Sequence, residues 1–195
     1  MISDPLSALL DVVGILDDLE IPYAVGGSVA SSVFGEPRAS ADADLIADIS
    51  QAQLRGLLAR LEGAYYVSED AARDAAKRHS SFNIIHLDSM YKVDIFVAGP
   101  SQMDREQLRR KVRVALTAAP DTDAFVTAAE NLIVRKLDWF RQSGETSDRQ
   151  WRDVLGILKV QAGALDMSYL RRNAEDAGLQ ALFDRALQES TPEDD

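Results

Sequence analysis

A change in hydrophobic period near Gly99-Pro100 constrains the fold more than any other feature of this sequence. Before this point, short β-rich runs alternate with helical segments; the strand-like runs cover residues 21–25, 43–49, 65–67, 82–87 and 91–97. After it, most of the apolar pattern repeats every 3.6 residues, as amphipathic helices require. The chain is therefore predicted to be an α+β protein with a sheet half and a helical half.

The connection between the two halves is too short for them to act independently, so we expect them to share a cleft. The predicted division is an α/β core in residues 1–100, a C-terminal helical subdomain in residues 101–189 and an acidic tail in residues 190–195. The core is expected to be a small mixed β-sheet flanked by helices.

In the second half, the pattern predicts a basic helix over residues 104–112 and one strand near residues 124–126. Capping boxes at Thr127 and Ser147 are expected to open the next two helices.

The hairpin signal at Asp88-Ser89 predicts that the last two strands of the first half pair with each other.

The sequence has 195 residues, of which 46% are apolar and 27% charged, a composition typical of a globular protein. No apolar run approaches the roughly 20 residues that span a bilayer. The N-terminal segment lacks a basic region and carries Asp4 and Asp11, which argues against a secretory signal. We therefore expect a cytoplasmic protein with no membrane partner.

The absence of cysteine and the presence of only two histidines exclude disulfides, thiol nucleophiles and Cys-ligated zinc, and leave little for imidazole chemistry. Any catalysis would rest on carboxylates, hydroxyls, Lys and Arg. The first 50 residues hold nine acidic side chains and a single cation, Arg38. Such a region repels phosphate unless divalent cations bind in it, so it is either a solvated acidic surface or a metal site.

A strand-like run ends at Gly26-Gly27-Ser28, and a short helix is predicted to follow. This order places unpaired backbone N–H groups at a helix start, where they can hold phosphate oxygens, and the glycines let a phosphate approach the backbone. The alternative is a tight turn with no ligand. The segment is neither a Walker A loop nor a GxGxxG motif.

The segment Asp42-Ala43-Asp44 lies in the next predicted strand, where a period of two places both carboxylates on one face, about 7 Å apart. Two such charges are unfavourable unless they are solvated or share cations. A solvated acidic face is the alternative. The apolar run at residues 45–47 favours a strand buried on both faces, with carboxylates that emerge into a cleft.

A third acidic residue, Asp94, lies in the middle of the apolar run 91–97, and Lys92 shares its face. A surface pair between these two residues is the alternative interpretation. Three carboxylates on neighbouring strands beside a phosphate-ready helix start would form an oxygen-lined site suited to Mg²⁺ or Mn²⁺. Such a site fits two-metal phosphoryl chemistry.

Together, Gly-Gly-Ser at 26–28, Arg-Ala-Ser-Ala-Asp-Ala-Asp-Leu at 38–45 and Lys-Val-Asp-Ile at 92–95 resemble the nucleotidyltransferase superfamily typified by DNA polymerase beta. Within it, the sequence is most similar to the bacterial AbiEii-type toxin nucleotidyltransferases, whose pattern reads GG and then R-x-T-x-D-x-D. The resemblance covers residues 23–46 closely and residues 82–97 and 128–155 more loosely.

The resemblance implies roles for individual residues. Asp42 and Asp44 would bind the metals, and Asp94 would complete the metal site and help to deprotonate the acceptor. Ser40 stands where the pattern usually has Thr, which keeps the hydroxyl. The residues implied to bind the nucleotide are Gly26, Gly27, Ser28, Arg38, Ser40 and Lys136.

Lys136 lies in the middle of an apolar helical face that includes Leu132 and Phe140. It must either snorkel to solvent or meet an anion. In the AbiEii-like proteins, a lysine on a comparable helix and an Arg or Lys and an Asp on the next helix contribute to the nucleotide site. The corresponding candidates are Arg149 and Asp153, for which an i,i+4 helix pair is the alternative.

The tryptophans, the histidines and a basic run are expected to lie in the core or on the surface, outside the predicted site. The spacing of Trp139 and Trp151 predicts that both lie in the core. His79 and His86 could touch a base or ribose, but a surface position is expected for both. The basic run at residues 105–113 is expected to be a solvated helix face, and a surface for a polynucleotide or a partner is the alternative. The run lacks interleaved aromatic residues for base stacking.

The expected function is transfer of NMP from an NTP donor to an acceptor hydroxyl, with Mg²⁺ or Mn²⁺ as cofactor. The acceptor would be an RNA 3′ end or a protein, and a small molecule such as an aminoglycoside stays open. The net charge of −11 disfavours extended duplex binding, although a short RNA 3′ end needs only a local basic patch. The resemblance also implies a cognate partner protein in a toxin-antitoxin pair. The alternative is a catalytically silent binding module or an antitoxin with the same fold.

Overall fold

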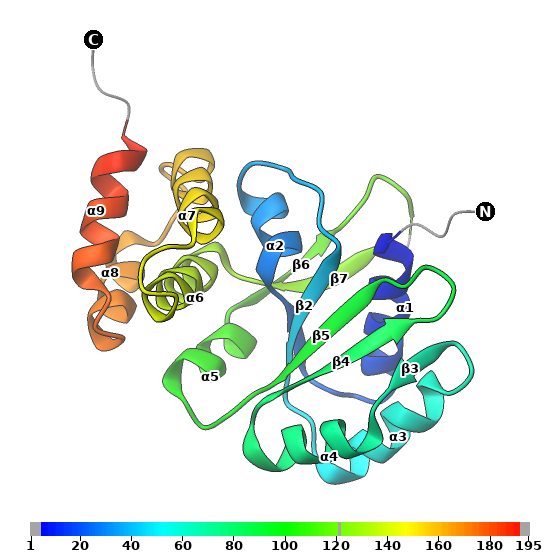
Figure 1. The fold of residues 1–195 in the computed structure, drawn as a ribbon. Helices are drawn as coiled ribbons and strands as arrows, with labels where there is room; N and C mark the ends of the chain where they lie inside the picture. The colour runs from blue at the N-terminus through cyan, green and yellow to red at the C-terminus, as the bar shows by residue number, and fades with distance from the viewer. Residues whose placement is uncertain (1–4, 121, 192–195) are drawn as a thin grey trace.

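The computed structural model describes residues 5–120 and 122–191, and within these ranges seven strands form one mixed sheet (Figure 1). The strand order is β3-β4-β5-β2-β1-β7-β6. The β2–β5 and β1–β7 pairs are parallel, and the other neighbours are antiparallel. The strands are β1 (Tyr23–Val25), β2 (Asp42–Ala47), β3 (Tyr65–Val67), β4 (Ser81–His86), β5 (Lys92–Val97), β6 (Lys111–Ala115) and β7 (Asp123–Thr127).

Helices cover both faces of the sheet (Figure 1). Three helices, α1, α3 and α4, pack together on one side, and α6 to α9 form a helical bundle on the other. The helices are α1 (Pro5–Asp18), α2 (Gly27–Phe34), α3 (Gln51–Leu61), α4 (Glu69–Arg78), α5 (Gln102–Arg109), α6 (Ala129–Gln142), α7 (Asp148–Val160), α8 (Met167–Asp176) and α9 (Gln180–Ser190). No helix within the described ranges has the length and apolar character needed to cross a membrane.

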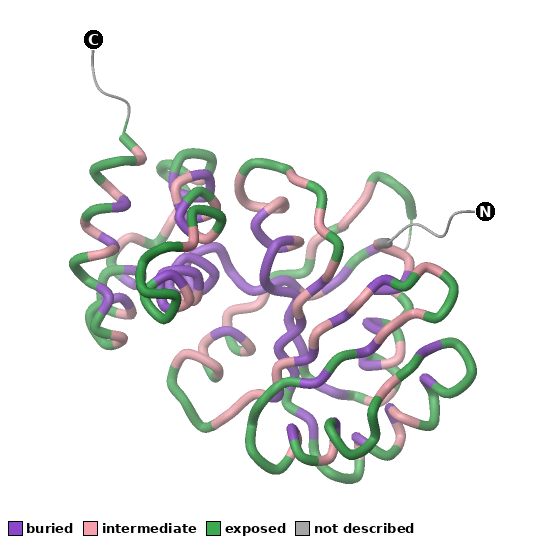
Figure 2. Tube along the Cα trace, viewed as in Figure 1, coloured by how far each residue is buried: buried purple, intermediate pink, exposed green. Residues whose placement is uncertain are grey.

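Strand β2 shows why the sheet can carry charged residues. Its residues Ala43, Leu45 and Ala47 are fully buried in the core beneath α1 and α3, while Asp42 and Asp44 point to the opposite face. Figure 2 shows burial concentrated in the central strands of the sheet and in α6 of the helical bundle. The alternation predicted from the sequence therefore leaves one face for packing and the other for chemistry.

Local signals at helix starts gave mixed outcomes. The capping box of Ser50 and Gln53 is formed at the start of α3, because each residue bonds the backbone of the other. The box predicted at Thr127 is not formed: Ala128 caps α6 without a side-chain bond, and the buried Thr127 hydroxyl has no hydrogen-bond partner. Ser147 precedes α7 as predicted but makes no capping hydrogen bond through its side chain.

The segment after Pro100 differs from the helical half that the sequence predicts. Helix α5 ends at Arg109, and residues 111–115 form β6 instead of continuing the expected basic helix over 104–112. Here Val112 and Val114 alternate with charged residues, a period-two pattern that is satisfied by antiparallel pairing with β7. The sheet therefore extends past residue 100, and the run of consecutive helices begins only at α6.

Two further expectations concern particular segments. The hairpin predicted at Asp88-Ser89 is present, since β4 and β5 pair antiparallel across it. Of the predicted acidic tail, Ser190 belongs to α9, and residues 192–195 lie outside the described residues.

Candidate active site

The register of β2 and β5 brings the three predicted aspartates to one place on the sheet. In this parallel pair Asp44 is the direct partner of Asp94, and Asp42 is the direct partner of Lys92. All four residues are only partly buried, so their side chains lie on the face of the sheet that is not packed against α1 and α3. The site is thus set by backbone pairing between segments about 50 residues apart.

A lysine lies inside this group of carboxylates. Lys92 Nζ is 2.6 Å from Asp94 Oδ2 and 3.9 Å from Asp42 Oδ2. On the other side of Asp94, the Asn83 amide donates a hydrogen bond to Oδ1 from strand β4. The Lys92–Asp94 pair that the sequence left as an alternative is therefore formed, but it lies within the aspartate cluster rather than on a separate surface.

Crowding of carboxylates changes the acidity of Asp44. Burial, followed by the negative charges of Asp42 and Asp94, raises the pKa of Asp44 to about 6. The ammonium groups of Lys136 and Lys92 act in the opposite direction and do not cancel the effect. The cluster is therefore a place where an added cation would relieve repulsion.

The start of α2 packs directly against the cluster. The Gly26 N–H donates to the Asp44 backbone carbonyl at 2.8 Å, and Gly27 has φ +53°. A Cβ on Gly27 would lie 1.7 Å from Asp44 Oδ2, so this position has no room for a side chain. The Ser28 hydroxyl donates to Ser40 Oγ at 2.6 Å, and Ser40 donates to Asp42 Oδ1 at 3.0 Å. Predicted phosphate-binding and metal-binding residues are thus joined by hydrogen bonds.

Three other predicted residues meet in an ion-pair network between the sheet and the helical bundle. Arg38 donates from Nε and Nη2 to the two oxygens of Asp153, each at 3.0 Å. Lys136 is 1% exposed, and its Nζ lies 2.7 Å from Asp153 Oδ2 and 3.0 Å from Gln150 Oε1. Lys136 therefore meets an anion and does not snorkel. Asp153 takes Arg38 and Lys136 as ion-pair partners, and no pair with Arg149 is present in the described part of the chain.

The acidities of this network follow from burial and pairing. Burial would raise the pKa of Asp153, but hydrogen bonds from Arg38 and Lys136 outweigh it and hold the pKa below its usual value. For Lys136, burial lowers the pKa although Asp153 stabilises the ammonium. Asp153 is thus the fixed anion of the network, and two cations converge on it from α6 and from the loop before β2.

Two adjoining hollows, each of about 250 Å³, lie along this face of the sheet. Gly27, Asp44, Phe96 and Trp139 line both. The first hollow also has Ser28, Arg38, Asp42, Asp94, Lys136, Arg149 and Gln150 in its wall. The second is lined further by Ile46, His79, Ser80, Ser81, Asp104, Gln107 and Arg135, among others. Asp42, Asp44 and Asp94 and most of the predicted nucleotide-binding residues therefore gather in the first hollow. Gly26 lines the second hollow, and Ser40 and Asp153 line neither of the two.

An aromatic pair connects the sheet to the helical bundle in the wall that the two hollows share. The rings of Phe96 on β5 and Trp139 on α6 are 5.9 Å apart between centroids. Trp139 is half-buried and lines the cleft, so the prediction that it belongs to the core is wrong; Trp151 is 8% exposed and is a core residue as predicted. The helical wheel misplaced Trp139 because the core-facing side of α6 continues into the cleft wall.

The carboxylate oxygens of the cluster are ligands of the type that a divalent cation prefers, but their positions in this structure do not surround a common point. Among the described residues, no three carboxylate or imidazole side chains are positioned to hold a metal ion. The carboxylate oxygens of Asp42, Asp44 and Asp94 are hard ligands of the kind that Mg²⁺ and Mn²⁺ prefer. The ammonium of Lys92 already occupies a cation position between two of them. The carboxylates present therefore match such a cation in chemistry, while in this structure an ammonium lies between two of them.

Sequence reasoning missed several contributors to the site. Gln150 accepts a hydrogen bond from Lys136, and Asn83 donates one to Asp94. In the sequence, Gln150 and Asn83 are ordinary polar residues. Asn83 could have been found from the strand period, since β4 pairs antiparallel with β5 across a short hairpin. His79 lines the second hollow and bonds the Ala98 carbonyl through Nδ1 at 2.7 Å, whereas His86 contacts Ser89 and lies outside both hollows.

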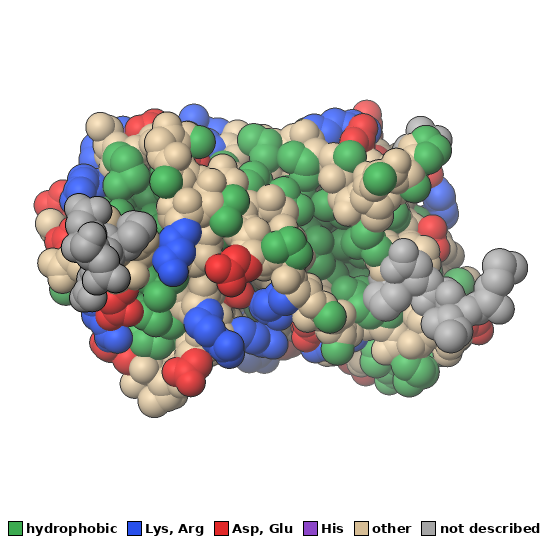
Figure 3. All heavy atoms as spheres, turned by 90° about the horizontal axis from the view of Figure 1, so that it is seen from above, with side chains coloured by type: hydrophobic (Ala, Val, Ile, Leu, Met, Phe, Trp, Pro, Cys, Tyr) green, Lys and Arg blue, Asp and Glu red, His purple; other side chains and the backbone are tan. Residues whose placement is uncertain are grey.

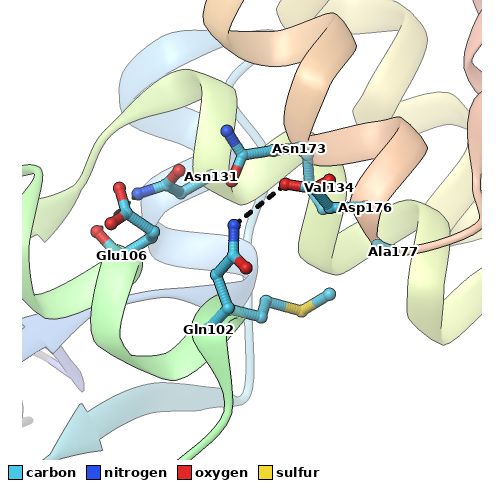
Figure 4. A pocket seen from close by; sticks show the side chains of 8 residues that line it. Gln102, Glu106, Asn131, Val134, Asn173, Asp176 and Ala177 are labelled. Carbon is cyan, nitrogen blue, oxygen red and sulfur yellow. Dashed lines mark hydrogen bonds between the residues drawn. The ribbon is translucent and has the colours of Figure 1, made fainter.

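A separate cavity of about 200 Å³ lies between α5, α6 and α8 and shares no lining residue with the two hollows. Figure 4 shows Gln102 and Glu106 of α5 facing Asn173 and Asp176 of α8, with Asn131 of α6 between them. The Gln102 amide donates to Asp176 Oδ2 at 3.0 Å across this space. The hydrogen bond across this cavity links α5 to the helical bundle. The cavity is not part of the aspartate site.

Comparison with known proteins shows the fold. No family model and no curated protein sequence matches the chain. Among solved structures, ANT(2″)-Ia in complex with adenylyl-2″-tobramycin matches with a TM-score of 0.62 at 12% identity, covering 90% of this chain and 98% of that one. A nucleotidyltransferase-like protein from Paracoccidioides brasiliensis has a TM-score of 0.58 at 14% identity, covering 96% and 94%. The lincosamide adenylyltransferase LnuA, lincomycin-bound, has a TM-score of 0.52 at 12% identity, covering 81% and 97%.

These structures share the α+β architecture of nucleotidyltransferases, and this chain has that fold. At such low identity the likeness shows the fold alone. The more specific resemblance to the AbiEii-type proteins is not decided by it.

Proposed function

We propose that the protein is a metal-dependent nucleotidyltransferase, which transfers NMP from an NTP to an acceptor hydroxyl and releases pyrophosphate. The observation that carries this proposal is the register of β2 with β5, which sets Asp44 beside Asp94 at the start of α2. A carboxylate cluster next to a Gly-Gly-Ser helix start provides metal ligands and phosphate ligands in one hollow.

The donor NTP would lie in the hollow that contains Arg38, Lys136 and Arg149. Their positive charges and the N–H groups at Gly27 and Ser28 suit a triphosphate. Arg149 is exposed and free to reach a phosphate, whereas Arg38 and Lys136 are already held by Asp153. In this proposal the Asp153 network fixes two cations at the wall of the donor hollow, and Arg149 closes over it.

In the reaction, the acceptor oxygen bonds to the α-phosphorus while the bond to the pyrophosphate oxygen breaks. Divalent cations, when bound, neutralise charge on the triphosphate and on the attacking and leaving oxygens. Asp42 and Asp44 would hold them, and Asp94 would accept the acceptor's hydroxyl proton. The rest of the catalytic effect would come from orientation of donor and acceptor in the cleft.

Several acceptors fit the molecule. Figure 3 shows basic and acidic side chains close together on one face, and with a net charge of −11 this argues against extended duplex binding. A single RNA 3′ end, a protein hydroxyl or a small molecule needs only the second hollow beside Asp44. Two proteins with this fold are described with antibiotics, tobramycin as an adenylyl product and lincomycin, which supports including small molecules among the acceptors.

The AbiEii-type resemblance adds a finer proposal, in which the enzyme is the cytoplasmic toxin of a toxin-antitoxin pair with a cognate partner protein. It rests on the sequence pattern at residues 26–28 and 38–45. Expression with and without the neighbouring gene would test it. Growth arrest that requires Asp44 and is relieved by the neighbour supports a toxin, and unaffected growth rejects that role.

The activity itself is tested by incubating the protein with each labelled NTP, Mg²⁺ or Mn²⁺, and separate pools of RNA, protein and small-molecule acceptors. Label transfer that is lost in Asp44→Asn supports the proposal. Asp48→Asn is the matched control, because Asp48 is an exposed acid just after the end of β2. Nucleotide binding without transfer to any pool would instead support the silent binding module.

A further inference from the structure

Lys92 places a positive charge where the proposed metal site needs one. The parallel register sets it directly opposite Asp42, and its Nζ lies 2.6 Å from Asp94 Oδ2 and 3.9 Å from Asp42 Oδ2. Its side chain is 38% exposed, so it has an open path away from the cluster. The ammonium therefore lies between two of the three carboxylates, and more than a third of its side chain is open to solvent.

A divalent cation and this ammonium would compete for the same oxygens. A cation bound to Asp94 Oδ2 would lie within a few ångströms of Lys92 Nζ, and the two positive charges would repel each other strongly. The other oxygen of Asp94 accepts a hydrogen bond from Asn83, and Oδ1 of Asp42 accepts one from Ser40. Metal binding at Asp42 and Asp94 would therefore compete with the lysine in the position that it occupies in this structure.

We infer that Lys92 is a built-in counter-ion of the unloaded site, which neutralises Asp42 and Asp94 until a divalent cation displaces it. The inference rests on the proposed function and adds a residue that opposes metal binding. Because the lysine and the cation compete for the same oxygens, the lysine weakens the affinity of the free protein for the metal. It also stabilises the protein when no metal is bound, since it reduces repulsion among the carboxylates.

The wild-type protein offers a direct test through the chemical reactivity of the lysine amine. Acetylation of Lys92 by an amine-reactive ester, followed by mass spectrometry, should be slow without metal and faster when Mg²⁺ or Mn²⁺ is added. The amine is then displaced and no longer paired with Asp94. Lys77, an exposed lysine on α4, should react at the same rate in both conditions. A rate at Lys92 that stays constant or falls on metal addition would overturn the inference.

Substitution gives a second test. Lys92→Met keeps the aliphatic stem and removes the charge, so Mn²⁺ should bind about tenfold more tightly or better, as measured from the paramagnetic resonance signal of free Mn²⁺. Lys92→Arg keeps the charge and should bind Mn²⁺ with close to wild-type affinity. Lys77→Met controls for loss of a surface charge and should not change the affinity. The metal-free Lys92→Met protein should also melt at a lower temperature than wild type.

The outcomes separate this inference from the proposed function. If wild type binds Mn²⁺, Asp44→Asn does not, and Lys92→Met binds no more tightly than wild type, the counter-ion role is wrong and the metal site stands. If neither wild type nor Lys92→Met binds Mn²⁺, both proposals are rejected. If Lys92→Met fails to fold, the acetylation rates of the wild-type protein decide the question.

Discussion

Gly27 shows how a single position is fixed by the chemistry beside it. Its φ of +53° lies in the left-handed region, and the space where a Cβ would stand is taken by the carboxylate of Asp44. The sequence indicated a glycine-dependent phosphate approach at this position. The structure adds a second reason, because a side chain here would push the carboxylate of Asp44, the proposed metal ligand, out of its place.

Gly27→Ala should therefore damage the site more than a change of backbone preference alone. Gly144→Ala is the matched control, since Gly144 has φ +69° but nothing within 4 Å of the position of its Cβ. Both variants should lose about 1 kcal/mol of stability from the left-handed backbone. We expect Gly27→Ala to lose more than the control, and to lose nucleotide transfer, as followed by thermal melting and label transfer. Equal melting and retained activity would contradict the close contact with Asp44.

Asp42→Ala and Asp44→Ala should each abolish NMP transfer while the protein stays folded, because the two side chains lie at a cleft wall and not in the core. Loss of a metal ligand should cost several kcal/mol of activation free energy, and each 1.4 kcal/mol is about tenfold in rate. Initial rates of label transfer and circular dichroism measure the two effects. Retention of more than about a tenth of wild-type activity by either variant would reject the metal-ligand assignment.

Asp44→Asn should stabilise the metal-free protein at neutral pH. The folded-state pKa of Asp44, about 6, lies above its unfolded value of 3.8, so the folded state holds the proton more tightly. Stability contributed by the protonated form is present at low pH and is lost as the pH rises toward and through 6. The loss is on the order of 3 kcal/mol from two pKa units, and the asparagine variant avoids it.

Melting curves from pH 4 to pH 8 without metal measure this effect. The difference in melting temperature between Asp44→Asn and wild type should grow in favour of the variant as the pH rises from 4 through the folded-state pKa of about 6, and should then level off. A variant that is less stable than wild type at pH 7 would show that Asp44 makes favourable contacts that outweigh the repulsion.

At the scale of elements, the strand period and the hairpin signal predicted the structure correctly, whereas the capping boxes at Thr127 and Ser147 did not form. The period of β2 placed Asp42 and Asp44 on one face, and the hairpin at residues 88–89 aligned β4 with β5. The partner of Asp153 could not be found this way. A helical wheel shows only neighbours on the same helix, so it suggested Arg149, whereas the pairing residues come from another helix and a distant loop.

Helix α6 supplies a prediction for Lys136, whose ammonium is held by Asp153 and Gln150 from α7. Lys136→Met keeps the packing of the stem and removes one of the two cations that Asp153 binds. If the lysine supports the donor hollow, affinity for a non-hydrolysable NTP analogue should fall about tenfold or more. Calorimetric titration measures this affinity.

Loss of protein stability must be separated from loss of nucleotide affinity, because Lys136 also neutralises a buried carboxylate. Lys136→Met combined with Asp153→Asn removes both charges and should recover stability without recovering affinity. An unchanged affinity in Lys136→Met would show that the lysine only joins α6 to α7.

At the scale of the whole molecule, the change of hydrophobic period separated sheet-forming from helix-forming sequence but missed strand β6, although the strand predicted near residues 124–126 is present as β7. Strands β6 and β7 return to the sheet after α5, and β7 pairs in parallel with β1, which lies about 100 residues earlier. Such long-range pairing has no local signature beyond alternating valines. The α+β class was therefore predictable, whereas the strand order was not.

Ligand binding should stabilise the molecule as a whole, because the site draws on both the sheet and the helical bundle. With Mg²⁺ and NTP at a hundredfold excess over Kd, the free energy of unfolding should rise by about 2.7 kcal/mol. Thermal melting with each NTP measures the gain, and Asp44→Asn should lose most of it. No shift in wild type with Mg²⁺ and any of the NTPs would reject nucleotide and metal binding together.

The hydrogen bond from Arg38 to Asp153 joins residues that are 115 positions apart, so it can form only after most of the chain has left the ribosome. Asp42, Asp44 and Asp94 have all been synthesised once the chain reaches residue 94. Asp153, which binds Arg38 and Lys136, is synthesised only with α7. A nascent or truncated chain that ends before α7 carries the carboxylates without their organised cations. Such a chain should be inert, so the proposed transfer activity would appear only when the last quarter of the protein has been synthesised and folded.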